Sequence, residues 1–285
     1  MTVIVAAAQM ACDPDRAVNI ARAESLIRAA AGRGANIVLL PELFETPYFP
    51  ADVDGSHFDL ARPFAGNAMI AQMAALAGEL GVVLPVGFFE RDGAVYYNSL
   101  TVIDADGRVG DLYRKSHIPE GPGYEEKHFF TPGDTGFRVW NTRFGTLGAA
   151  VCWDQWFPEC ARVLALQGAE ILLYPTAIGN EPQDPSYDSS AHWRRVMQGH
   201  AAANMVPVVA ANRVGVDANP GAEMTFYGSS FIADATGAIV ADAPREGEAV
   251  ITAEFDLESI RAQRLDWGLF RDRRPDLYGS LADGG

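Results

Sequence analysis

The feature that most constrains the fold is a passage that occurs twice in the chain. Residues 34–42 read Gly-Ala-Asn-Ile-Val-Leu-Leu-Pro-Glu, and residues 168–176 read Gly-Ala-Glu-Ile-Leu-Leu-Tyr-Pro-Thr. Each copy follows an amphipathic segment, and its glycine precedes an unbroken apolar run. This order is typical of a helix that leads into a strand covered on both faces. The repeat therefore predicts two halves built on one plan.

Later segments extend this plan. Residues 100–107 resemble residues 230–237, and both segments place a turn with Asp and Gly after an apolar run. Helices are expected at residues 16–31, 67–80, 157–167 and 188–205, and strands at residues 2–9, 35–40, 82–90, 95–104, 108–113, 137–151 (two strands), 171–174 and 206–211. Two sheets packed face to face, each covered by helices, would bury all the apolar strands. We therefore predict an α/β fold in which residues 1–285 form one domain.

Composition excludes several classes of protein. With 37 acidic and 22 basic residues among 285, the formal charge is −15, which disfavours binding to nucleic acid or to anionic membranes. The apolar residues 2–10 are too few to span a bilayer and have no basic segment before them. Three cysteines without CxxC spacing favour a reducing compartment, and we expect a cytoplasmic protein.

Three reactive side chains follow predicted strands: Glu42, Lys115 and Cys152. Ligands of α/β sheets collect at strand ends, where a thiol could attack as a nucleophile if a carboxylate took its proton and an ammonium stabilised the oxyanion. Taken singly, each also fits a structural role, as a buried thiol, a loop acid or a surface cation. HExxH, GxSxG and glycine-rich phosphate loops are absent from the sequence, so neither a metal nor a cofactor is expected.

Three segments, in this order, resemble the signature segments of the nitrilase superfamily, the carbon-nitrogen hydrolases: residues 41–44, 113–119 and 151–159. The similarity covers nearly the whole chain and is closest to the N-carbamoylputrescine amidohydrolases, on residues 121–127, 174–179 and 192–201. The resemblance implies a four-layer αββα sandwich with an internal pseudo-twofold repeat. It also implies a homo-oligomer, a dimer or larger, in which residues 256–285 are expected to contact another subunit.

The resemblance also implies roles for single residues. Cys152 would be the nucleophile, Glu42 the general base and Lys115 the oxyanion and positioning residue, with Glu126 as a second glutamate of the site. The implied reaction converts N-carbamoylputrescine into putrescine, ammonia and carbon dioxide through a thioester-like intermediate, in polyamine synthesis.

Specificity depends on charge. Related hydrolases of carbamoyl amino acids place basic residues after the nucleophile, whereas residues 153–156 carry none, which favours a small cationic carbamoyl amine as substrate. Glu181 is expected to pair with its ammonium, and Trp153, Thr176 and Tyr48 are further candidates for the pocket. An ω-amidase, an aliphatic amidase, an N-carbamoyl amino acid hydrolase and a non-catalytic nitrilase-like binding scaffold remain the alternatives.

Overall fold

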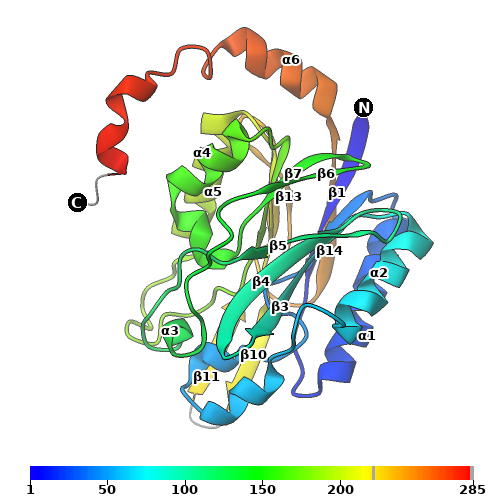
Figure 1. The fold of residues 1–285 in the computed structure, drawn as a ribbon, viewed down its shortest axis with the longest axis vertical. Coiled ribbons are helices and arrows are strands. Elements are labelled where there is room, and N and C mark those ends of the chain that lie inside the picture. Colours follow the sequence, from blue (N-terminus) through cyan, green and yellow to red (C-terminus); the bar gives the residue numbers. More distant parts are fainter. Residues whose placement is uncertain (220–221, 283–285) are drawn as a thin grey trace.

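The computed structural model of the chain describes residues 1–219 and 222–282, and it shows two sheets face to face between two pairs of helices (Figure 1). The first sheet has the order β14-β1-β2-β3-β4-β5, in which two three-stranded ladders meet at a parallel bridge between Ile37 and Val83. Its strands are β14 (Ala249–Asp256), β1 (Thr2–Gln9), β2 (Ile37–Leu39), β3 (Leu84–Asp92), β4 (Val95–Ile103) and β5 (Val109–Arg114).

The second sheet repeats this order as β6-β7-β8-β9-β12-β13. Strands β7 and β8 pair in parallel, as β1 and β2 do, and in each sheet an antiparallel strand, β6 or β14, flanks this pair. The strands are β6 (Val139–Thr142), β7 (Gly145–Ala149), β8 (Ile171–Pro175), β9 (Val208–Ala211), β12 (Phe231–Ala233) and β13 (Ile239–Asp242). The αββα fold and the repeat predicted from the sequence are confirmed.

Helices α1 (Arg16–Gly32) and α2 (Ala68–Leu80) cover the first sheet, and α4 (Pro158–Leu166) and α5 (Ser190–Asn204) cover the second (Figure 1). Polar side chains cap the N-termini of α1 and α2. The side chain of Asp15 accepts from the amide of Ala17, and that of Asn67 accepts from the amides of Met69 and Ile70. Such caps stabilise a helix by about 1 kcal/mol. The helices thereby begin where the sequence predicts.

Strand β1 shows why the central strands are apolar throughout. Val3, Val5 and Ala7 face the core between the two sheets, whereas Ala6 and Ala8 face the core under α1 and α2. Because successive side chains of a strand point to opposite faces, both faces must be apolar when both are covered. The same layering brings the loops after β2, β5, β7 and β8 to one end of the sandwich.

Four elements differ from the expectation. Strand β14, the hairpin of β10 (Val214–Asn219) and β11 (Ala222–Tyr227), and the short helix α3 (Glu126–Phe129) were not predicted. β14 carries polar residues at its outer positions because it is only partly covered, so its apolar signal is weak. It nevertheless pairs with β1 along all eight residues of that strand.

The chain after β14 lies outside the four layers (Figure 1). It forms α6 (Leu257–Trp267) and two single 3₁₀ turns, Pro275–Leu277 and Gly279–Leu281, whereas residues 283–285 of the predicted tail lie outside the described residues. Large apolar side chains on it remain exposed, including Leu265 at 73% and Trp267 at 68%. No helix in residues 1–219 and 222–282 is both long and apolar enough to cross a membrane.

Candidate active site

The structure brings four of the predicted residues together. Glu42 follows β2, Lys115 follows β5, Cys152 follows β7, and Glu126 opens α3. The Nζ of Lys115 lies 2.9 Å from Oε1 of Glu42 and 2.6 Å from Oε2 of Glu126. All four side chains are buried, so the Coulomb energies between them are far less screened than on the surface.

Cys152 lies in a tight turn between β7 and a 3₁₀ turn, Cys152–Trp156, and its φ of +43° is in the left-handed region. Non-glycine residues occupy this region mainly where surrounding structure holds them, often at reactive sites. Its Sγ is 3.8 Å from the carbonyl oxygen of Ala177. Burial, followed by the charge of Glu42, raises the pKa of the thiol well above its ordinary value. If this thiol acts as a nucleophile, it needs a base to take its proton.

The two carboxylate oxygens of Glu42 differ in their hydrogen bonds. Its Oε1 accepts from the Nδ2 of Asn98 at 2.7 Å and from Lys115, whereas Oε2 has no hydrogen-bond partner among the residues that the structure describes. An ionised carboxylate oxygen without a donor can accept a proton. Sequence analysis missed Asn98, although a buried amide in the middle of an apolar strand is a signal for a polar partner.

The second carboxylate of the site, Glu126, has a raised pKa. Burial and the charge of Glu42 raise the pKa of Glu126 to about 7, against the opposing effects of Lys115 and of Tyr48, whose hydroxyl donates to Oε1 at 2.7 Å. Burial opposes the charge of Lys115, but Glu126 and Glu42 raise the pKa of its ammonium above the ordinary value. Lys115 is therefore a permanent cation next to a carboxyl that titrates near neutral pH.

This shift predicts a pH-dependent stability difference for Glu126→Gln. Folded Glu126 keeps its proton up to about pH 7, but unfolded Glu126 loses it near its ordinary pKa of 4.5, so wild-type stability falls as pH rises between these values. Because glutamine cannot lose this proton, the stability of the variant relative to wild type should rise with pH over that interval and be constant above it. Urea unfolding at pH 5, 6, 7 and 8 measures the difference.

Glu125→Gln is the matched control for that series, since Glu125 makes no ion pair with Lys115 among the described residues. If the stability difference between Glu126→Gln and wild type is the same from pH 5 to pH 8, the raised pKa of Glu126 is contradicted.

A buried aspartate joins two turns of the site. The carboxylate of Asp154 accepts from the hydroxyl of Tyr113 at 2.7 Å, from the backbone amide of Val151 at 3.0 Å and from Nδ1 of His117 at 2.8 Å. These bonds tie the turn after β7 to the chain that follows β5. Sequence analysis did not single out Asp154, which lies two residues after the candidate nucleophile.

A cavity of about 310 Å³ opens above the thiol of Cys152. Two of the predicted pocket residues, Trp153 and Glu181, line it, as does Glu126. The lining does not include Thr176, whose hydroxyl is buried against Oε1 of Gln155 at 3.0 Å, or Tyr48, which reaches the site through Glu126. Further lining residues, which sequence analysis did not assign to the pocket, include Glu120, Tyr124, Trp156, Tyr187 and His192.

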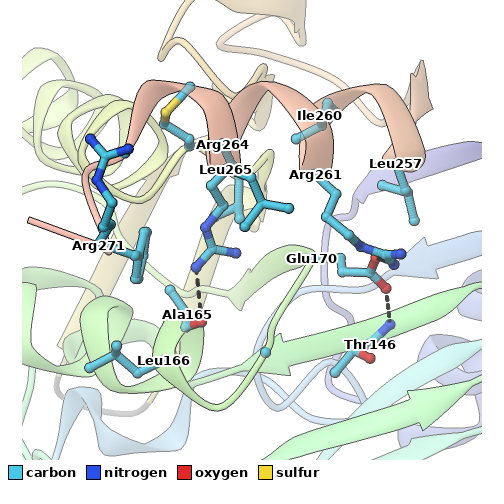
Figure 2. A pocket seen from close by; sticks show the side chains of 15 residues that line it. Thr146, Ala165, Leu166, Glu170, Leu257, Ile260, Arg261, Arg264, Leu265 and Arg271 are labelled. Carbon is cyan, nitrogen blue, oxygen red and sulfur yellow. Dashed lines mark hydrogen bonds and ion pairs between the residues drawn. The ribbon is translucent and has the colours of Figure 1, made fainter.

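A larger cavity, about 430 Å³, lies under α6 and is drawn in Figure 2. Its cations are already engaged: Nη2 of Arg264 donates to the carbonyl of Ala165 at 2.9 Å, and Arg261 pairs with Glu170. The lining residues include neither a cysteine nor a serine. The catalytic candidates therefore lie at the smaller cavity. Within residues 1–219 and 222–282, no group of three or more His, Cys, Asp or Glu side chains is arranged to hold a metal ion.

Comparisons with known proteins agree with this geometry. Residues 4–265 match the carbon-nitrogen hydrolase family model. The chain is 56% identical over 283 residues to N-carbamoylputrescine amidase of Arabidopsis thaliana, covering 98% of this chain and 95% of the relative. It is 52% identical over 277 residues to a citrullinase of Francisella tularensis, covering 97% of each. A crystal structure of a carbon-nitrogen hydrolase from Helicobacter pylori superposes with a TM-score of 0.93 at 40% identity, covering 99% of both chains.

Proposed function

Because this chain belongs to the carbon-nitrogen hydrolase family, we propose that it hydrolyses N-carbamoylputrescine to putrescine, ammonia and carbon dioxide, a reaction of polyamine synthesis. The observation that carries the proposal is the buried cluster of Cys152, Glu42, Lys115 and Glu126 at a cavity whose other charged side chains are acidic. The 56% identity to a plant N-carbamoylputrescine amidase supports the same substrate.

In the first half of the reaction, Oε2 of Glu42 takes the proton of Cys152 while the sulfur attacks the ureido carbon. A carbon–sulfur bond forms, and the carbonyl π electrons move to oxygen. The ammonium of Lys115 stabilises this oxyanion together with the backbone amide of Trp153. Such preorganised donors typically contribute about 10²- to 10³-fold to the rate.

In the second half, the tetrahedral intermediate collapses and expels one nitrogen, which takes the proton held by Glu42. The resulting acyl thioester is then attacked by water, which gives its proton to Glu42. The thiol is then released and the product is a carbamic acid, which loses carbon dioxide and the remaining nitrogen. The whole reaction consumes one water. Glu126 keeps Lys115 in place through its 2.6 Å contact.

Charge at the cavity favours a cationic tail. Glu120 and Glu181 line it, and the lining residues in the described part of the chain include neither an arginine nor a lysine. Glu181 is proposed to pair with the terminal ammonium of the substrate, and Trp153 to contact its methylene chain. The faces of aromatic rings also attract cations.

Citrulline is the second candidate, because the chain is 52% identical to a citrullinase. Citrulline has the same ureido group and the same number of methylenes between it and the carbon that bears the amine, and it adds an α-carboxylate on that carbon. An unpaired carboxylate beside Glu120 and Glu181 would be repelled, and a carboxylate is usually bound by an arginine or lysine. Among residues 1–219 and 222–282, no arginine or lysine lines the cavity.

Ammonia release by the purified chain tests the proposal. N-carbamoylputrescine should exceed citrulline, N-carbamoyl-β-alanine, α-ketoglutaramate, a simple aliphatic amide and an aliphatic nitrile in kcat/KM by at least about 100-fold. Each of these compounds lacks the terminal ammonium or adds a carboxylate, and a difference of about 3 kcal/mol in binding corresponds to this factor. A higher kcat/KM for citrulline or another carboxylate would contradict the proposed substrate.

Glu181→Gln should raise KM for N-carbamoylputrescine about 10-fold and change kcat less than about 3-fold. A charge-assisted hydrogen bond to the ammonium contributes about 1.5–3 kcal/mol to binding, and it lies far from the reacting carbon. The preference over citrulline should fall by a similar factor. Glu254→Gln, an exposed carboxylate on β14, is the control. An unchanged KM for Glu181→Gln would remove this residue from the substrate site.

We also propose a homo-oligomer in which a second copy covers α6 and the chain after it. The support is the exposure of Leu265 and Trp267 beside the open cavity of Figure 2, since apolar patches of this kind mark interaction surfaces. Light scattering should give a dimeric or larger mass for wild type and a smaller mass for Leu265→Glu. Val53→Glu, at another exposed apolar residue, should leave the mass unchanged. A monomeric wild-type mass would contradict the proposal.

The proposal includes one catalytic domain over residues 1–285 in a reducing compartment, the cytoplasm. Its support is that Cys12, Cys152 and Cys160 are all free thiols. Cell fractionation checks the location.

A further inference from the structure

A fully buried arginine lies behind Glu42. Arg213 follows β9, the fourth strand of the second sheet, and none of its surface is exposed. Its guanidinium donates to two successive backbone carbonyls after β2: Nη2 lies 2.7 Å from the oxygen of Leu43 and 3.1 Å from that of Glu42, and Nε lies 3.2 Å from the latter. The arginine therefore connects the second sheet to the turn that carries Glu42.

That turn needs support. Leu43 has a φ of +48°, a left-handed conformation that residues with a side chain adopt rarely. Besides the bonds from Arg213, the amide of Glu42 donates to the carbonyl of Thr176 at 3.3 Å, and the carbonyl of Leu43 accepts from the amide of Thr46 at 3.2 Å. Because the direction of the Glu42 side chain follows from the backbone of this turn, the guanidinium helps to set where the carboxylate points.

The same guanidinium reaches the second glutamate. Oδ2 of Asp217 accepts from Nη1 of Arg213 at 2.9 Å and from the backbone amide of Tyr48 at 2.9 Å. The hydroxyl of Tyr48 in turn donates to Glu126. The Arg213 guanidinium also lies 5.8 Å from the ring centre of Tyr48, within the range of a cation–π contact. One buried ion pair thus connects to both carboxylates that flank Lys115.

We infer that Arg213, with Asp217 as its partner, is a positioning residue of the reaction: it holds the turn of Glu42 directly and Glu126 through Tyr48. This inference rests on the proposed roles of the two glutamates. Arg213 does not line the cavity, so it acts through these residues and not on the substrate. Only arginine offers several donors in one rigid plane, and lysine cannot span both carbonyls and the aspartate.

The test compares Arg213→Lys and Asp217→Asn with wild type and with Arg62→Lys. Arg62 is the matched control, because it also donates to two backbone carbonyls, those of Asp59 and Ala61, but lies on the surface. We expect kcat for N-carbamoylputrescine to fall about 10- to 100-fold in the first two variants, since small displacements of a catalytic group have effects of this size. KM should stay within about 3-fold.

The pH profile adds an independent readout. Loosening the Tyr48 contact removes a hydrogen bond that lowers the pKa of Glu126, so any limb of the kcat profile that Glu126 controls should move to higher pH. Circular dichroism and thermal melting establish that each variant is folded. If Arg213→Lys does not fold, Asp217→Asn, which keeps the shape of the side chain, decides the question.

Glu42→Gln, assayed in parallel, separates this inference from the proposed function. Lack of turnover by wild type, or full turnover by Glu42→Gln, contradicts the proposed function itself. A different pair of results contradicts only the role of Arg213. In that case Glu42→Gln loses turnover, whereas folded Arg213→Lys and Asp217→Asn keep the wild-type kcat and pH profile.

Discussion

Cys152→Ala is expected to lower kcat by about 10⁴-fold or more while the fold stays intact, because removal of a covalent nucleophile abolishes the two-step route. The side chain is small and alanine keeps the packing of the turn. The oxyanion site and the base would remain, but neither can replace the carbon–sulfur bond of the first step. Ammonia release from N-carbamoylputrescine, followed to long times, measures the loss.

Cys160→Ala is the matched control. Cys160 is buried as well, but it belongs to α4 and faces the core instead of the cavity. Its replacement should change kcat less than about 3-fold, although it creates a small void and lowers stability by about 1 kcal/mol. Full activity of folded Cys152→Ala would rule out the cysteine mechanism, and it would favour water as the attacking group.

Lys115→Met is expected to lower kcat about 10³-fold or more and to destabilise the fold by about 3–5 kcal/mol near pH 8. Methionine has a similar length but no charge, so it removes the oxyanion donor and leaves Glu42 and Glu126 buried without their cation. Without that cation, each of the two buried carboxylates disfavours ionisation of the other.

The pH dependence distinguishes this mechanism from simple loss of packing. Without Lys115 the folded-state pKa of Glu126 rises further, since the ammonium is the main group that lowers it. The destabilisation should therefore be smaller at pH 5, where the carboxyl is protonated in the folded chain, and larger at pH 8. Urea unfolding at both pH values measures it.

Lys127→Met is the control for that experiment, because Lys127 pairs with Glu120 on the surface, where an ion pair contributes about 0–1 kcal/mol. Equal destabilisation of Lys115→Met at pH 5 and pH 8 would show that lost packing, and not the loss of charge, is responsible.

Much of the fold follows from local pattern. The bounds of α1 and α2 agree with the predicted helices within about one residue, because glycine, a polar cap and the 3.6-residue period are all local signals. Strand β14 escapes prediction because its partly exposed face mixes polar and apolar residues. It forms because β1 offers an unpaired edge along its full length.

Some residues of the candidate site could be predicted from the sequence, and others could not. The sequence places Glu42, Lys115 and Cys152 at strand ends, and the resemblance adds Glu126; their catalytic roles remain predictions. The pattern does not show that Asn98 fixes Oε1 of Glu42, since the two residues are 56 positions apart, and Asn98 lies in β4 whereas Glu42 follows β2.

The sequence by itself determines the order of helices and strands, their internal repeat and the residues available at strand ends, because these depend on periodicity within about ten residues. Only the tertiary structure decides which polar side chains meet. Arg213 reaches the carbonyls of residues 171 and 170 positions earlier in the chain because the two sheets are stacked. A buried charge is stable only with its partners in place, so packing selects the arrangement in which they meet.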